Sequence, residues 1–323
     1  MARMRLAGES PRGGREAPGS AHPAHGTGCR TVPPVILDGR PPARVIDAVT
    51  VRRAARFRSA TGGRVPTLAA VAADEAGAVA HVALKRRIFA RLGLELRPVR
   101  LPASTGTADA LACIDALNDD RDVHGIFVQF PLPPGVDARA CHDRVALAKD
   151  VDASGAAALG RLLRGDPLHL PATPAAALRL LEHYGIPLAG TRTVVVEGEP
   201  IMAQPLTALL LRGGALVSVH DPDDPDLAAA VGSAALLVAA SGRPGAIPGT
   251  WLRDGAVVVD TGYYHPGAEG EVLLAGEAAR LAAYTPHRGG LGPLTVALLA
   301  AATARAAERA VGLDSGADET PPT

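Results

Sequence analysis

The sequence contains very little lysine. Of its 33 basic residues, only Lys85 and Lys149 are lysines, and arginine supplies all the others. Asparagine occurs once and glutamine twice, so coding bias explains much of the pattern. Arginine keeps its proton in a protein, whereas lysine can release it. Each of the two lysines is therefore a candidate for a role that arginine cannot fill, such as proton transfer.

Other absences exclude whole classes of protein. Lys+Arg and Asp+Glu are both 33, which argues against a nucleic-acid binder or a polybasic membrane-surface protein. The three cysteines, Cys29, Cys113 and Cys141, lack metal-type spacing, so we expect neither a disulfide scaffold nor a metal site. No apolar run approaches ~18 residues, and the N-terminus lacks a signal-like apolar segment. We expect a soluble cytoplasmic protein.

Short apolar runs alternate with helical patterns along most of the chain. Segments 1–33 and 312–323 lack periodicity and are predicted to be disordered tails. The length of 323 residues suggests two domains. Alternating strands and helices predict an α/β protein with parallel sheets covered by helices. The predicted strands are 67–73, 95–99, 123–130, 193–196, 216–220, 235–241 and 256–261.

Three helices can be predicted with their ends. One contains Leu111, Ile114 and Leu117 at three-residue spacing. A second begins with Thr173 as N-cap and proline at the first helical position, and turns at Gly185. A third, 205–211, ends at two glycines that can form a C-cap. The last helix, 293–311, follows a glycine-rich turn.

His81 and Lys85 are four residues apart, so they share one face of a predicted helix. Arg86 and Arg87 follow directly, so an ordinary solvated face is the alternative interpretation. The scarcity of lysine favours a functional role for Lys85.

Polar residues also interrupt the apolar run 124–133 and follow it. Gln129 stands at its carboxyl end, directly before a Pro-Leu-Pro turn, where open α/β sheets bind ligands. A glutamine that only satisfies loop backbone is equally plausible there. The later segment Lys149–Asp150–Val151–Asp152 holds the other lysine, although such alternating charges usually form a surface turn.

The segment 193–205 has the strand–turn–helix order of a dinucleotide-binding unit. Such turns are normally rich in glycine, so that backbone N–H groups can approach phosphates. Here Glu197 and Glu199 flank the single Gly198. A carboxylate near a pyrophosphate is repulsive by roughly 1 kcal/mol or more, even when screened.

Two further segments could contact a ligand. Asp223 follows the next predicted strand, where a carboxylate can accept hydrogen bonds from a ribose and repels a 2′-phosphate, which favours NAD over NADP. A helix cap is the alternative. Segment 285–295 places glycines before the last helix, either as a ligand-facing turn or as a tight turn only. The sequence contains no Ser-His-Asp arrangement of the kind found in acyl-enzyme hydrolases, so that class has no support.

Taken together, segments 125–133, 149–152 and 289–295 closely resemble the methylenetetrahydrofolate dehydrogenase/methenyltetrahydrofolate cyclohydrolase family, the FolD type. The resemblance runs from about residue 36 to the last helix. It implies a folate (catalytic) domain at 34–158, completed by helix 293–311, and a Rossmann-like NAD(P)-binding domain at 159–292. It also implies a homodimer.

By position in this family, Lys85 is the catalytic lysine, Gln129 its hydrogen-bond partner and Asp152 the aspartate that holds the pterin. His81 stands where the family has tyrosine. The resemblance places the cofactor, NADP with NAD as an alternative, at Glu197, Gly198 and Glu199. Thr261 and Tyr263 complete that expected cofactor site.

The chain departs from the family mainly on its nucleotide side. The usual Gly-Arg-Ser of the phosphate turn is replaced by residues 197–199, and the serine/arginine pair for a 2′-phosphate falls near Asp223. Three functions follow. The first is NADP-dependent oxidation of 5,10-methylenetetrahydrofolate, with hydrolysis of the methenyl product to 10-formyltetrahydrofolate. The second is hydrolysis alone. The third is folate binding without catalysis.

Overall fold

The computed structural model describes residues 33–198, 200–262 and 269–313, and every structural statement below concerns these residues. Nearly all of both predicted tails lies outside them, as do Glu199 and Tyr263. Within the described part, no helix combines the length and the hydropathy needed to cross a membrane.

A three-stranded parallel sheet forms the first part of the structure. Its order is β3 (Glu95–Leu101), β2 (Thr67–Ala73) and β4 (Gly125–Val128). All seven residues of β2 are buried, as expected for a central parallel strand of alanine, valine and leucine. The helices that follow these strands are α2 (Ala76–Arg91), α3 (Thr107–Asp119), α4 (Ala138–Arg144) and α5 (Ala156–Arg164). Strand β4 ends one residue before Gln129.

A six-stranded parallel sheet forms the second part, in the order β1-β11-β9-β7-β5-β6. The predicted strands correspond to β5 (Arg192–Glu197), β6 (Leu216–His220), β7 (Leu236–Ala240) and β9 (Val257–Asp260). Four two-residue strands were not predicted, because two residues carry no periodicity. These are β1 (Val35–Ile36), β8 (Ile247–Pro248), β10 (Val272–Leu273) and β11 (Ala283–Tyr284). Two helices accompany the sheet, α7 (Pro200–Arg212) and α8 (Leu227–Ser233).

Two helix starts differ from the prediction. Helix α6 (Ala172–His183) has Pro171 as its N-cap, so Thr173 lies inside the first turn and the predicted N-cap was wrong. Helix α7 begins at Pro200 rather than residue 205, with Pro205 inside it. Its predicted end is confirmed, because α7 stops at Arg212 and Gly214 follows with φ +80°.

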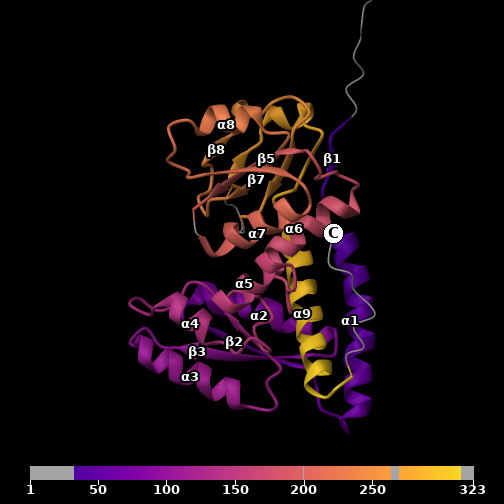
Figure 1. The fold of residues 1–323 in the computed structure, drawn as a ribbon, viewed down its shortest axis with the longest axis vertical. Coiled ribbons are helices and arrows are strands. Elements are labelled where there is room, and N and C mark those ends of the chain that lie inside the picture. Colours follow the sequence, from indigo (N-terminus) through magenta and orange to yellow (C-terminus); the bar gives the residue numbers. More distant parts are fainter. Residues whose placement is uncertain (1–32, 199, 263–268, 314–323) are drawn as a thin grey trace, which may run out of the picture. The chain divides into compact units, whose positions relative to one another are not determined.

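The long helices α1 (Arg40–Ala60) and α9 (Leu291–Ala310) lie side by side, as Figure 1 shows, and α9 also packs on α6. The prediction that the last helix returns to the N-terminal part is confirmed. The fully buried Glu308 of α9 accepts hydrogen bonds from Arg53 at 2.5 Å and Arg56 at 2.7 Å, both on α1. Removing one partner of such a buried pair typically costs about 3–5 kcal/mol, so this contact fixes α9 against α1.

Candidate active site

Lys85 lies on the face of α2 that lines a cleft. His81, Leu84, Lys85 and Ile88 share this face, because residues three and four apart on a helix are neighbours. The Lys85 Nζ donates a hydrogen bond to Gln129 Oε1 at 2.5 Å. It also lies 4.8 Å from the centre of the Phe127 ring on β4, within the range of a cation–π contact. The amine is thus held by groups from the end of one strand.

Gln129 is itself held in place by the backbone around it. Its N–H donates to Val71 O of β2 at 2.8 Å, which continues the sheet past the end of β4. Its Nε2 donates to Phe130 O at 2.8 Å. Because the amide nitrogen is used in this way, Oε1 is the atom that faces Lys85. The glutamine therefore positions the lysine amine without adding a charge.

Burial lowers the pKa of Lys85 from 10.5 to about 8, while the negative charge of Asp152 acts in the opposite direction. Desolvation disfavours the charged form of an amine, and a neutral amide partner does not compensate for it as a carboxylate would. Near neutral pH the amine can therefore both release and accept a proton. Such a displaced pKa beside a cleft is typical of acid–base chemistry.

Asp152 shows the complementary displacement. Burial raises its pKa from 3.8 to about 7, and the hydrogen bond from Ala172 N, 2.9 Å from Oδ1, opposes that rise. Ala172 is the first residue of α6, so the carboxylate lies at a helix N-terminus, where negative charge is favoured. Lys85 and Asp152 influence each other electrostatically, although Asp152 is not among the residues that line the cleft.

The cleft has a volume of about 760 Å³, which is large enough for a folded-over organic ligand and part of a second one. On its other side it is lined by the end of β9 and by the turn before α9. The predicted residues Lys85, Gln129, His81 and Thr261 all line it. The remaining lining residues include Phe130, Thr173, Asp260, Gly262, His287, Arg288, Gly289 and Gly290.

The glycines before α9 allow a close approach of two chain segments. Gly289 adopts φ +86°, a conformation that favours glycine. Gly39 donates to Gly289 O at 2.8 Å, and a Cβ at Gly39 would lie 2.0 Å from Gly290 O. No side chain fits at Gly39. This contact brings the turn beside the start of α1 and shapes one wall of the cleft.

The predicted phosphate turn lies at the end of β5. Glu197 is half-buried, and burial raises its pKa; among the described residues its Oε1 is buried without a hydrogen-bond partner. A Cβ at Gly198 would lie 1.9 Å from Ser241 O. The chain can therefore run beside the residue that follows β7 only because residue 198 is glycine. The turn therefore presents an acidic group where dinucleotide turns usually present backbone N–H groups.

Charged residues at the end of β6 pair with one another. Asp223 accepts a hydrogen bond from Arg243 Nη1 at 2.8 Å, and this bond lowers the pKa of the Asp223 carboxyl. Asp224 is 2.8 Å from His220 Nδ1. The N-cap residue of α8 is Asp226, so the alternative interpretation, in which the acidic segment after β6 caps the next helix, is not met at Asp223. The Asp223 carboxylate, which we expect near a ribose, is therefore paired with Arg243.

Two family models match the chain. Residues 37–152 match the tetrahydrofolate dehydrogenase/cyclohydrolase catalytic domain, and residues 171–311 match the NAD(P)-binding domain of the same family. The chain belongs to this family. The resemblance predicted from the sequence is thereby confirmed, as is the two-domain α/β fold.

Individual relatives agree with the family assignment. The bifunctional protein FolD of Acidobacterium capsulatum is 42% identical over 281 residues, covering 86% of this chain and 99% of that protein. The FolD protein of Saccharophagus degradans is 39% identical over 279 residues, with the same coverage. The crystal structure of Trypanosoma brucei FolD, complexed with NADP and an inhibitor, is 31% identical with a TM-score of 0.79, covering 86% of this chain and 98% of that one.

Several residues in the cleft or in contact with Lys85 were not predicted from the sequence as site residues of this tetrahydrofolate dehydrogenase/cyclohydrolase chain. Phe127 was counted only as an apolar strand residue, although its ring contacts the lysine amine. Leu84 and Ile88 could have been found, because they continue the spacing of His81 and Lys85. Asp260, whose pKa burial raises, lies at a strand end as Gln129 does.

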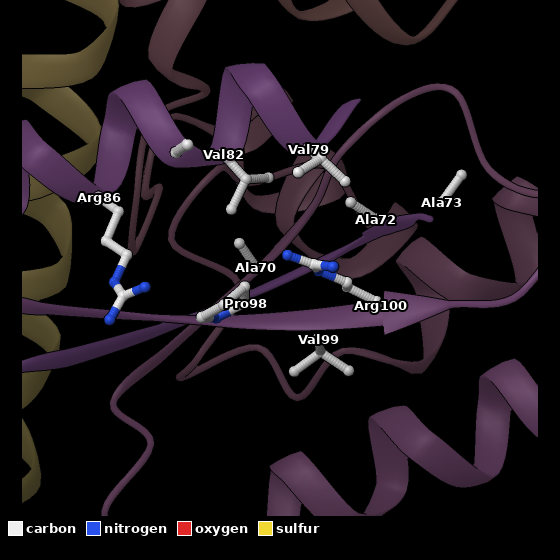
Figure 2. A pocket seen from close by; sticks show the side chains of 10 residues that line it. Ala70, Ala72, Ala73, Val79, Val82, Arg86, Pro98, Val99 and Arg100 are labelled. Atoms are coloured by element: carbon white, nitrogen blue, oxygen red, sulfur yellow. The ribbon is translucent and has the colours of Figure 1, made fainter. Parts of the chain in front are cut away.

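A second, much smaller cavity of about 70 Å³ lies on the opposite face of α2 (Figure 2). Figure 2 shows Val79, Val82 and Arg86 of α2 above Pro98 and Arg100 of β3. Its floor consists largely of alanines, among them Ala70 and Ala72. Helix α2 therefore separates this apolar cavity from the cleft that holds Lys85.

Proposed function

We propose that this chain oxidises 5,10-methylenetetrahydrofolate to the methenyl form and hydrolyses that product to 10-formyltetrahydrofolate. The observation that carries the proposal is the Lys85–Gln129 pair, in which a desolvated amine with a pKa of about 8 faces a cleft of about 760 Å³. An acid–base group with a pKa near the working pH is best placed to move protons.

In the hydrolytic step, Lys85 would handle the protons. Its neutral amine takes a proton from the water that attacks the bridging carbon. Its ammonium form returns a proton to the ring nitrogen that leaves as the carbon–nitrogen bond breaks, and one net proton is released. Gln129 holds the amine in place throughout, because its hydrogen bond serves both protonation states.

Asp152 and His81 would bind rather than react. A carboxylate can accept hydrogen bonds from the N–H groups of a pterin edge, and Asp152 is fixed for that by Ala172 N. His81, in the cleft wall, can donate a hydrogen bond from its imidazole. It cannot supply the larger phenol surface of a tyrosine at the same position.

A nicotinamide dinucleotide supplies the hydride acceptor for the oxidation. The described residues fit its ribose better than its phosphates. Glu197 Oε1 is enclosed by protein and Glu197 does not line the cleft, so its carboxyl group bears on the phosphates only through its charge. Thr261 lines the cleft, and Asp223, which we expect near the ribose, carries a charge that repels a 2′-phosphate. We therefore propose NAD in preference to the NADP first expected.

A second candidate is an enzyme that performs only the hydrolysis. The acidic Glu197 at the phosphate turn favours it, since a carboxylate opposes a pyrophosphate there. The homodimer, the cytoplasmic location, the domain boundaries, and the cofactor contacts of Glu199 and Tyr263 remain predictions. The last two residues lie outside the described part of the chain.

The test is a pair of assays on the purified protein. Oxidation of methylenetetrahydrofolate is followed with NAD and NADP side by side, and hydrolysis of methenyltetrahydrofolate without nucleotide. We expect both reactions, with a lower KM for NAD. Hydrolysis alone would establish the second candidate, and absence of both reactions would refute the proposed function.

A further inference from the structure

His142 contacts two segments that carry residues of the active site, although it does not line the cleft. It belongs to α4, and only 2% of it is exposed. Its ring stacks on Phe130 with 5.2 Å between centroids and an interplanar angle of 28°. Phe130 follows Gln129 directly and accepts the hydrogen bond from its Nε2. The ring therefore supports the segment that orients Gln129.

The second contact of His142 is to the turn that contains Asp152. Its Nδ1 lies 2.6 Å from Ser154 Oγ. The turn is closed by Asp150, whose carboxylate accepts hydrogen bonds from Ser154 N at 3.1 Å and Gly155 N at 2.9 Å. Ala153 adopts φ +48° within it, a conformation that alanine rarely takes. A turn strained in this way needs external contacts to hold its shape.

Ser154 Oγ lies 2.6 Å from His142 Nδ1 and 3.3 Å from Asp150 Oδ1. One hydrogen bond therefore joins the imidazole to the turn, and the tautomer of His142 decides which of the two groups donates. Among the described residues, Nε2 is buried without a partner, and burial lowers the pKa of His142 to about 4. The neighbouring charge of Asp143 opposes that shift without cancelling it. The ring stays neutral and cannot act as a proton donor to substrate.

We propose that His142 is a positioning residue of this active site, which holds the Gln129 segment and the Asp152 turn at a fixed distance from each other. One neutral ring joins them, by stacking on one side and by a hydrogen bond on the other. The inference rests on the proposed function, since it concerns how that site is held. Small displacements of catalytic groups are costly, because an error of about 1 Å can lower a rate ~100-fold.

His124 provides a matched control within the same chain. It is also buried, burial lowers its pKa to about 4, and its ring meets Phe57 at 5.0 Å. Its Nδ1 accepts a hydrogen bond from Thr67 N at 3.1 Å, at the opposite end of β2 from the site. Replacing either histidine by phenylalanine removes one hydrogen bond and keeps an aromatic ring.

The experiment compares His142→Phe and Ser154→Ala with His124→Phe. Because the chain has only two lysines, an amine-selective label read by peptide mass spectrometry reports the pKa of Lys85, with Lys149 as internal reference.

Loosening the two segments admits water to the Lys85 amine. Since burial is the main cause of its low pKa, the labelling midpoint of Lys85 in His142→Phe and Ser154→Ala should rise by about half a unit or more. The kcat/KM for hydrolysis should fall about tenfold. The His124→Phe protein should match the wild type in the labelling midpoint of Lys85 and in kcat/KM. His142→Asn, which can still donate to Ser154, should recover part of the loss.

Labelling does not require turnover, so the two proposals can fail separately. A wild-type protein without hydrolytic activity refutes the proposed function, while the labelling midpoints still decide the role of His142. Unchanged midpoints in both His142→Phe and Ser154→Ala, or equal shifts in His124→Phe, would overturn the positioning role. If His142→Phe does not fold, Ser154→Ala alone decides, because it removes a single oxygen atom from the turn.

Discussion

The expected folate and nucleotide sides of the molecule differ in how they treat charged groups. On the folate side, Lys85 and Asp152 are half-buried, and desolvation moves the pKa of each toward neutrality, to about 8 and about 7. On the nucleotide side, Asp223 is largely exposed and its charge is satisfied by Arg243. Desolvation supplies reactivity at Lys85 and Asp152, whereas the charge of Asp223 is compensated by an arginine of the protein.

The difference teaches that one part of a shared cleft can keep its chemistry while the other changes its ligand preference. A proton-transfer group needs a precise position and a low dielectric environment, which the strand end at Gln129 provides. A phosphate site needs open N–H groups, whereas the turn at the end of β5 carries the carboxyl group of Glu197. The two requirements rest on different residues, so they can diverge independently.

The largest effect is expected from Lys85→Met. Without the amine, hydrolysis should fall between about 100- and 10,000-fold, the range of acid–base catalysis. The matched control is Lys149→Met, because the Lys149 Nζ donates to three carbonyl oxygens at the end of α3, those of Leu117, Asn118 and Asp120. That variant should lose about 1–3 kcal/mol of stability in urea unfolding and keep its kcat. A Lys85→Met protein that retains full activity would show that Lys85 does not move protons in the hydrolysis.

A change in the pH profile is expected from Gln129→Glu. A carboxylate beside Lys85 favours the ammonium form, so the pKa of the lysine should rise by about one to three units. Where the rate depends on the neutral amine, its midpoint moves from about pH 8 to higher pH. Activity at pH 7 should fall and recover in alkaline buffer. A profile that stays in place would mean that Lys85 is not the group that titrates.

Much of the fold and of the folate side could be predicted from the sequence. The apolar strand runs indicated both sheets, and the scarcity of lysine drew attention to Lys85 before its contacts were known. Two-residue strands such as β1 could not be predicted, because pairing with a distant strand creates them. His142 could not be predicted as a site residue for a similar reason. Its role depends on Phe130 and Ser154, which local sequence does not connect with it.

The nucleotide side is tested by the double variant Glu197→Gly, Glu199→Ser. Removing two carboxylates should tighten the binding of both dinucleotides about thirtyfold, since each repulsion is worth roughly 1 kcal/mol. Isothermal titration of NAD and NADP measures the change. Glu182→Ser, which removes an exposed carboxylate on α6, controls for net charge. Equal affinity in the double variant and the parent would show that the acidic turn does not limit binding.

The smallest effect is expected from Asp223→Ser, because both partners of this ion pair are largely exposed and solvent screens them. The substitution removes a carboxylate that repels a 2′-phosphate and releases Arg243 to bind one. The ratio of NADP to NAD affinity should therefore rise about three- to tenfold, with little change in NAD binding itself. Adding Arg243→Ala to this variant should abolish the gain, because the guanidinium is the group that would hold the phosphate. If the ratio rises equally with and without Arg243, only the removal of repulsion matters, and Asp223 alone sets the preference.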